Sequence, residues 1–209
     1  MSAVVILAAG DFPSSDKTLG ILASAQALIC CYSAATEAIE RGFMPDFIIG
    51  DMDSLPEHYK SQFGDRIIEI REQDDNDLTK AFNFSLNLNP SHIHILGGTG
   101  RREDHTLGNI GHLADFASLA SCPVEMVSDW GRFIATDGRK ELTFTSHQGE
   151  QISIFAFDNT LKIHSDGLLY PTDDVRFDNL WQATLNEALS ESFSLTLSHP
   201  AKVLVYFAW

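Results

Sequence analysis

Residues 93–119 read IHILGGTGRREDHTLGNIGHLADFASL, and this stretch decides the fold class. A short apolar run, Ile93–Leu96, leads into a glycine-rich turn, and a segment of helical length follows from Asp104 to Leu119. Apolar or small side chains recur in that segment at intervals of three and four residues, which is the spacing of one helix face. The stretch therefore predicts a strand, a tight turn and a helix, the repeating unit of an α/β sheet.

The same unit recurs through the first 130 residues. Short apolar runs alternate with segments of helical length, and several runs are continuous, as in strands covered on both faces. This pattern predicts a Rossmann-like parallel sheet with helices on both faces. The expected strands are Val4–Ala8, Leu28–Tyr32, Phe47–Ile49, Ile67–Ile70, Ile93–Leu96 and Val124–Val127. The expected helices are Leu19–Gln26, Ala34–Arg41, Pro56–Phe63, Leu78–Leu88 and Asp104–Leu119.

After about residue 130 the helical spacing fades, and short segments of alternating apolar and polar residues appear between turn signals. Such alternation is typical of strands with one buried face. We therefore expect an α/β domain over residues 1–130 and an antiparallel β-sandwich over residues 131–209. The expected strands of the second domain include Leu142–Thr145, Ile152–Phe155, Ser194–Ser198 and Val203–Phe207.

The composition excludes several classes of protein. The 209 residues are 44% hydrophobic, and 29 Asp and Glu against 14 Lys and Arg give a formal charge of −15. Disorder is not expected at this hydrophobic content, and the acidic balance argues against nucleic acid as a partner. There is no apolar run of about 18 residues, so we expect no membrane association and a cytoplasmic location. Cys30, Cys31 and Cys122 show neither disulfide nor zinc spacing and are expected to be buried thiols.

Two carboxylates follow the expected strand at 47–49. Residues two apart in an extended segment point the same way, so Asp51 and Asp53 are expected to aim at one point above the sheet. Two such anions repel each other unless a cation or proton lies between them, and Mg²⁺ takes carboxylate and phosphate oxygens. A solvated turn with Ser54 capping the next helix is the alternative, and the spacing alone does not choose between them.

A second acidic cluster, QDDNDLTK at residues 73–80, falls at the next strand-to-helix turn. Asp77 is a candidate N-cap of the following helix. For Asp75 we prefer a purely structural role, in which its charge is stabilised by the positive N-terminal end of that helix. Three carboxylates beside the first pair also indicate a cation, and the two clusters form one acidic pocket if their strands are neighbours. Lys80 is placed to pair with a carboxylate or with a phosphate.

The glycine-rich turn that opens the last expected helix forms the third cluster. Its glycines allow the backbone to approach an anion, and the helix start offers N–H groups. Arg101 and Arg102 add forked donors for phosphate oxygens, and His105 is a candidate acid–base group or phosphate donor. A flexible turn capped by Asp104 is the alternative. The turn is neither a Walker sequence nor Gly-x-Gly-x-x-Gly, and the remaining histidines, which lack His-Glu-x-x-His spacing, are interpreted as surface or core residues.

Together the clusters predict metal-bound phosphates over an acidic sheet edge, which is typical of a nucleotide-dependent phosphoryl or pyrophosphoryl transferase. The spacing does not identify the acceptor. In this order, the clusters resemble those of the thiamine pyrophosphokinase (thiamine diphosphokinase) family. The segments that carry the resemblance are 44–55, 73–81, 97–110, 149–154 and 165–171.

The resemblance implies Mg²⁺-dependent transfer of pyrophosphate from ATP to the thiamine hydroxyl, with release of AMP, in a homodimer that binds thiamine between its subunits. Residues 1–130 would be the nucleotide-binding catalytic domain and residues 131–209 the thiamine-binding domain. By matching position, Asp51, Asp53 and Asp77 are the implied catalytic residues that hold the metal, and Asp74 would lie near thiamine and the phosphates. We expect Asp74 to be catalytic as well, as the carboxylate that accepts the hydroxyl proton. The implied nucleotide-binding residues are Thr99, Gly100, Arg102, Asp104 and His105, and the implied substrate-binding residues are Gln73, Tyr170 and Asn186.

The sequence departs from the family pattern in two places. After the second strand the family has Ala-Asp-Gly-Gly-Ala-Asn, whereas residues 31–36 read CYSAAT, and Leu185 stands where a serine usually precedes Asn186. Two alternatives stay open: a pyrophosphokinase for another hydroxymethyl heterocycle such as a pterin, and a non-catalytic sensor of thiamine or nucleotide. A purely structural interaction module leaves the three clusters unexplained.

Overall fold

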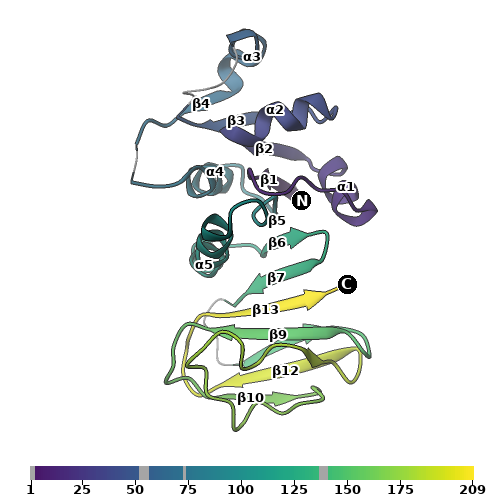
Figure 1. Ribbon diagram of the computed structural model, residues 1–209. Coiled ribbons are helices and arrows are strands. Elements are labelled where there is room, and N and C mark those ends of the chain that lie inside the picture. Colours follow the sequence, from purple (N-terminus) through teal and green to yellow (C-terminus); the bar gives the residue numbers. More distant parts are fainter. Residues whose placement is uncertain (1–2, 52–56, 73, 137–140) are drawn as a thin grey trace. The chain divides into compact units, whose positions relative to one another are not determined.

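The computed structural model describes residues 3–51, 57–72, 74–136 and 141–209 (Figure 1). Contacts divide the chain into two compact units. The first consists of Met1–His112 with Ala120–Asp129, and the second of Leu113–Leu119 with Trp130–Trp209. Within the described ranges, no helix combines the length and the apolar character needed to cross a membrane.

The first unit contains parallel strands in the order β6-β5-β1-β2-β3-β4. The chain starts in the middle of this sheet, builds outward through β2 to β4, and then returns to the other side of β1. The strands are β1 (Ala3–Leu7), β2 (Ala27–Cys31), β3 (Phe47–Gly50), β4 (Ile67–Glu69), β5 (His92–Leu96) and β6 (Val124–Ser128). The helices are α1 (Asp16–Ala23), α2 (Tyr32–Glu40), α3 (Glu57–Phe63), α4 (Asp77–Leu86) and α5 (Glu103–Leu119), with a 3₁₀ turn at Gly64–Arg66.

Helices cover both faces of this sheet, as the continuous apolar runs predict. On one face, Val5 and Leu7 of β1 pack in a cluster with Leu22 of α1 and Ala35 of α2. Ile6 of β1, which points to the other face, is also fully buried. Helix α4 contacts β1, β2 and β3, and Figure 1 shows it on the opposite side of the sheet from α1.

The second unit is a sandwich of two antiparallel sheets, which confirms the expected class. One sheet runs β11-β9-β13-β7 and the other β10-β12-β8. Phe193 and Phe207, one from each sheet, meet in the core with ring centroids 5.9 Å apart. The strands are β7 (Gly131–Ala135), β8 (Glu141–Thr145), β9 (Gln151–Ala156), β10 (Ile163–Asp166), β11 (Asn186–Glu187), β12 (Ser192–Leu197) and β13 (Val203–Ala208).

Sequence patterning missed three of these strands. Strand β10 has a single large apolar residue, Ile163, because Ser165 fills its other inward position. Strand β11 is only two residues long, and β7 carries Phe133 and Ile134 side by side instead of in alternation. Hydrogen bonds and packing with the neighbouring strands stabilise each of these three strands. The alternation of apolar and polar residues within one strand does not reveal that stabilisation.

The cysteines are free thiols, but only two of them match the expectation of burial. Cys30 and Cys31 are buried in β2, whereas Cys122 is partly exposed. Burial, with a smaller contribution from Asp46, raises the pKa of Cys30 to about 12. Burial and the nearby Asp77 charge raise the pKa of Cys31 well above its ordinary value. Both thiols of β2 therefore stay protonated at neutral pH.

Asp129, directly after β6, fastens the segment that begins α1. Its carboxylate accepts hydrogen bonds from the Ser14 N–H at 3.0 Å, from the Ser14 hydroxyl at 2.5 Å and from the Ser15 N–H at 3.0 Å. The Thr18 hydroxyl donates to it as well. Burial alone would raise the pKa of Asp129, but these donors outweigh it and hold the pKa far below its ordinary value.

We expect Asp129 to make the protein sensitive to acid. A carboxyl group whose pKa is lowered by folding contributes stability that is fully present above its unfolded pKa of about 3.9 and is lost as the pH falls below it. Urea unfolding should therefore show a steeper loss of stability below about pH 5 for the wild type than for Asp129→Asn. At neutral pH the variant should be the less stable of the two. Identical pH dependence in both proteins would contradict this role.

Candidate functional site

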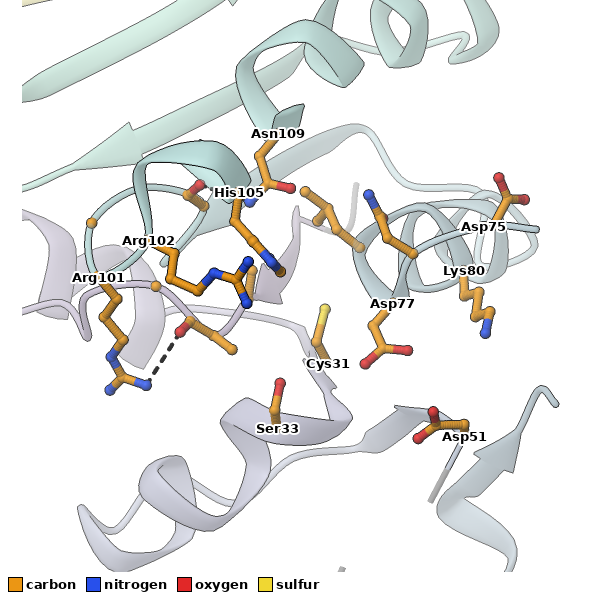
Figure 2. Close-up of a pocket in the computed structure, with 17 residues that line it drawn as sticks. Cys31, Ser33, Asp51, Asp75, Asp77, Lys80, Arg101, Arg102, His105 and Asn109 are labelled. Carbon is orange, nitrogen blue, oxygen red and sulfur yellow. Dashed lines mark hydrogen bonds between the residues drawn. The ribbon is translucent and has the colours of Figure 1, made fainter. Parts of the chain in front are cut away.

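A pocket of about 510 Å³ opens in the first unit, beyond the carboxyl ends of its strands (Figure 2). It lies where the strand order reverses around β1, which is where open α/β sheets bind ligands. Its lining comes from the segments after β1 to β5 and from the starts of α4 and α5. The lining residues are Ala8, Ala9, Gly10, Cys31, Ser33, Asp51, Asp75, Asn76, Asp77, Leu78, Lys80, Gly98, Gly100, Arg101, Arg102, His105 and Asn109.

Two carboxylates from different segments of the chain meet at one side of this pocket. Asp51 follows β3, Asp77 begins α4, and Figure 2 shows both carboxylates facing the same space. Burial, followed by the charge of Asp51, raises the pKa of Asp77, while Lys80 lowers it. Strands β3 and β4 are paired neighbours, so the first two acidic clusters share one pocket as the sequence predicts.

Gly50 allows this close approach. A Cβ built on Gly50 would lie 2.5 Å from the Cβ of Tyr32 and 3.1 Å from Oδ1 of Asp77. The approach of Tyr32, at the start of α2, leaves no room for a side chain at the end of β3, so a glycine is required at this position.

The loop before α4 differs in detail from the sequence-based expectations. Asn76 is the helix cap, because its side-chain oxygen accepts the Thr79 N–H at 2.8 Å, so the alternative of Asp77 as cap is wrong. Asp75 lines the pocket, but Figure 2 shows its carboxylate directed away from Asp51 and Asp77. Asp74 is exposed and is not among the described lining residues.

In the part of the chain that the structure describes, Lys80 is engaged with the main chain. Its side chain is buried, and its ammonium donates to the main-chain carbonyls of Ile70, at 3.1 Å, and of Glu72. These bonds tie the loop after β4 to helix α4. Lys80 therefore holds the loop that carries the second acidic cluster, while its charge favours an ionised Asp77.

An arginine and a histidine lie at the opposite side of the pocket. Figure 2 shows Arg102 and His105, from the start of α5, directed into it. Asp104 does not line the pocket; it accepts two hydrogen bonds from the Arg102 guanidinium, at 2.6 and 3.1 Å, and one from the His105 N–H at 2.9 Å. The Arg102 bonds lower the pKa of Asp104 to about 2. Because α5 begins at Glu103, Asp104 lies in the first turn of the helix and is not its cap.

The glycine-rich turn is held by the loop after β1. The Gly10 N–H donates to the Gly97 carbonyl at 2.7 Å, and the Asp11 N–H donates to the Thr99 carbonyl at 2.8 Å. Arg101 adds a third connection, because its guanidinium donates to the Ala9 carbonyl at 3.2 Å and to Glu37 of α2 at 2.5 Å. Arg101 is therefore already engaged in fastening the turn.

Helix α5 holds the turn from the other side. The Asn109 side-chain amide donates to the Gly98 carbonyl at 2.8 Å, and the Thr106 hydroxyl accepts the Gly100 N–H at 3.1 Å. Sequence reasoning did not assign Gly10, Asn76 or Asn109 to the site. The position of Gly10 after the first strand and the place of Asn109 in segment 97–110 were usable signals, whereas the role of Asn76 depends on a contact that spacing does not reveal.

The departure after β2 changes the pocket edge. Tyr32 is buried in the core between the sheet and helices α1 and α2, and it is not among the described lining residues. Ser33 does line the pocket, and its hydroxyl points into it (Figure 2). A hydroxyl group thus stands where the family pattern has a glycine.

Tyr170 and Asn186 belong to the second unit and contact each other. Asn186 is buried; its side-chain oxygen accepts the Tyr170 N–H at 3.0 Å, and its amide donates to the Tyr170 carbonyl at 2.7 Å. Tyr170 as a residue is 61% exposed. Asn186 therefore positions the backbone from which an exposed aromatic ring projects.

Four further residues that the sequence predicts for the site are not found in the pocket lining: two are described but do not line the pocket, and two lie outside the described ranges. Thr99 and Asp104 are next to lining residues but are not among them. Asp53 and Gln73 lie outside the residues that the structure describes.

Comparison with known proteins identifies the family. Residues 19–126 match the family model "Thiamin pyrophosphokinase, catalytic domain", and residues 131–206 match "Thiamin pyrophosphokinase, substrate-binding domain". The chain belongs to the thiamin pyrophosphokinase family. The family resemblance inferred from the sequence is thereby confirmed.

Individual relatives agree with the family assignment. Thiamine pyrophosphokinase 1 from Oryza sativa subsp. japonica is 37% identical over 93 residues, which cover 40% of this chain and 35% of the relative. Thiamine pyrophosphokinase from Bacillus subtilis is 34% identical over 76 residues, which cover 34% of this chain and 36% of the relative. The aligned stretches thus span about a third of the length of these curated relatives.

The fold extends over the whole chain. The crystal structure of thiamine pyrophosphokinase from Bacillus subtilis superposes with a TM-score of 0.78, covering 99% of this chain and 98% of that one at 19% identity. This likeness confirms the fold class, with its parallel sheet in the first part of the chain and its antiparallel strands in the second.

Proposed function

We propose that this protein transfers the pyrophosphoryl group of ATP to the hydroxyl of thiamine, giving thiamine diphosphate and AMP. The observation that carries the proposal is the pocket of about 510 Å³ at the strand ends. Within it, paired carboxylates on one side face an arginine and a histidine on the other. A polyphosphate chain needs both sides: cationic donors for its oxygens, and carboxylates that hold a metal ion against them.

The acidic side fits Mg²⁺. The fold brings Asp51 and Asp77 together and raises the pKa of Asp77 through burial and the charge of Asp51, so a divalent cation between them relieves a repulsion that is already present. We propose that Asp51 and Asp77 hold the ion and that Asp53 completes the set. When bound, Mg²⁺ would neutralise charge on the phosphate oxygens.

The basic side fits the phosphate chain. Arg102 reaches the pocket with its guanidinium oriented by Asp104, and His105 follows on the same helix turn. Because the turn at 97–100 is held from both sides, these donors are positioned before the nucleotide binds, which lowers the reorganisation needed in the transition state. Thr99, Gly100, Arg102, Asp104 and His105 are the proposed nucleotide site.

Thiamine, the substrate that receives the pyrophosphoryl group, requires an aromatic surface to stack on and a group that takes the proton of its hydroxyl. We propose that Tyr170, held by Asn186, supplies the face on which the flat, partly cationic thiamine stacks. Gln73 is proposed to contact the same substrate, and the exposed Asp74 to accept the hydroxyl proton. Binding of thiamine between the subunits of a homodimer is part of this proposal.

The direct test is AMP formation from ATP and Mg²⁺ by the purified protein, with and without thiamine. We expect thiamine-dependent AMP together with an equal amount of thiamine diphosphate. If AMP appears with a hydroxymethyl pterin but not with thiamine, the pterin and not thiamine is the substrate that receives the pyrophosphoryl group. Folded protein that binds ATP but releases no AMP with either acceptor would contradict the enzymatic proposal.

A further inference from the structure

Three metal-ligating side chains meet at the end of the sheet opposite the nucleotide pocket. His92 and His94 lie two residues apart on β5, so both project from the same face of the sheet. Glu125 lies on the neighbouring strand β6, directly opposite His94 in the register. These residues stand near the amino-terminal ends of β5 and β6, whereas the pocket with Asp51 and Asp77 lies beyond the carboxyl ends.

The distances fit a single ion. His92 Nε2 lies 3.8 Å from Oε2 of Glu125, and His94 Nδ1 lies 3.7 Å from the same oxygen. One ligand atom of each residue lies within 4.8 Å of the other two, and the two imidazole rings are stacked with centroids 4.2 Å apart. Ligands about 2.0–2.1 Å from a tetrahedral ion are about 3.3 Å apart, so the three ligand atoms must move closer and the two imidazole rings must rotate out of their stacked arrangement when the ion binds.

The surroundings also favour a bound ion. Leu96 and Val127, the next residues of β5 and β6 on this face, are part of the buried core, and the side chains of His92, His94 and Glu125 are 28%, 20% and 13% exposed. Nε2 of His92 is buried and has no hydrogen-bond partner among the described residues. A buried polar atom in this state costs stability, and coordination of a metal removes that cost.

We propose that His92, His94 and Glu125 form a binding site for a divalent transition metal of the Zn²⁺ class, distinct from the Mg²⁺ site. Two imidazoles and one carboxylate are a donor set that Zn²⁺ prefers over Mg²⁺, and three protein ligands leave a position for water or a further ligand. Because the ligands come from two paired strands, bound metal joins β5 to β6 and stabilises the first unit.

The site can be tested with Co²⁺ as a spectroscopic probe. The full-length protein, without an affinity tag and treated with a chelator, is titrated with Co²⁺ in the presence of excess Mg²⁺, which occupies the acidic pocket. We expect one equivalent of Co²⁺ to produce the visible absorption of a four-coordinate site and Zn²⁺ to displace it. The thermal unfolding midpoint should rise when Zn²⁺ is added.

Matched variants locate the binding. His92→Gln and Glu125→Gln should each weaken Co²⁺ binding by about 100-fold or more, since each removes one of three ligands. His164→Gln, which alters an exposed histidine of the second unit, and Asp77→Asn should bind Co²⁺ as the wild type does. Far-ultraviolet circular dichroism without metal shows whether each variant is folded. If His92→Gln or Glu125→Gln does not fold, His94→Gln is measured in its place.

Two results would overturn the proposal. One is the absence of four-coordinate absorption in the wild type at Co²⁺ concentrations well above those of the protein. The other is unchanged affinity in folded His92→Gln or Glu125→Gln, because the ion would then be bound elsewhere. In that second case, loss of binding in Asp77→Asn would assign the ion to the acidic pocket.

Discussion

Asp77→Asn is expected to reduce thiamine-dependent AMP release by at least about 100-fold while the protein stays folded. The substitution keeps the volume of the side chain and removes the charge that lies beside Asp51 at one side of the pocket. Charge stabilisation is the main contribution expected in phosphoryl-group chemistry, so the loss should appear in turnover. Steady-state assays over a range of Mg²⁺ concentrations measure it, and the variant should need more Mg²⁺ to reach its own maximum.

The same substitution should not weaken the fold. Burial and Asp51 raise the pKa of Asp77, which means that the folded state disfavours its ionised form. The neutral Asn removes that unfavourable contribution, so the unfolding free energy at neutral pH should be equal to or slightly above that of the wild type. Asp65→Asn, an exposed position in the 3₁₀ turn, is the matched control and should keep full activity. A folded Asp77→Asn protein with normal turnover would show that Asp77 is not part of the catalytic site.

Gly10→Ala should have the largest effect on stability. A Cβ at Gly10 would lie 2.1 Å from the Thr99 carbonyl oxygen and 2.5 Å from that of Gly97, and neither backbone atom can rotate away. The loops after β1 and β5 must then separate, which breaks the bond from the Gly10 N–H to the Gly97 carbonyl. We expect a loss of about 3 kcal/mol in unfolding free energy, together with reduced activity, because both loops line the pocket.

Gly20→Ala provides the comparison. Gly20 lies within α1, and a Cβ there would meet nothing within 4 Å. Alanine is favoured over glycine inside a helix, so this variant should gain about 0.5–1 kcal/mol with unchanged activity. Urea denaturation of the two variants beside the wild type measures the difference. Equal stability of Gly10→Ala and Gly20→Ala would mean that the two loops are not packed as the structure shows.

Much of the fold was readable from local patterns. Each predicted strand of the first unit appears within about one residue of its expected bounds, because a buried parallel strand is a continuous apolar run in the sequence itself. Strands β7, β10 and β11 were missed for the opposite reason: their sequences are short or weakly apolar, and pairing with neighbouring strands stabilises them.

The candidate site was readable only in part. The sequence places Asp51, Asp77, Arg102 and His105 at strand-to-helix turns, and the structure brings all four into one pocket. In the structure, the Asp75 carboxylate points away from the paired carboxylates, and the Lys80 ammonium donates to two backbone carbonyls. Spacing along the chain does not distinguish a side chain that faces a pocket from one that faces solvent.

The sequence by itself determined the class of each half of the chain and the family, and it predicted the chemical character of the site, because periodicity and motifs are properties of contiguous residues. Only the tertiary structure decided which groups meet: Gly10 against Thr99, Asn186 against Tyr170, and two histidines against Glu125. These contacts join different segments of the chain, 16 or more residues apart. They depend on strand order, register and the direction of each side chain, which are set when the sheets assemble and the core packs.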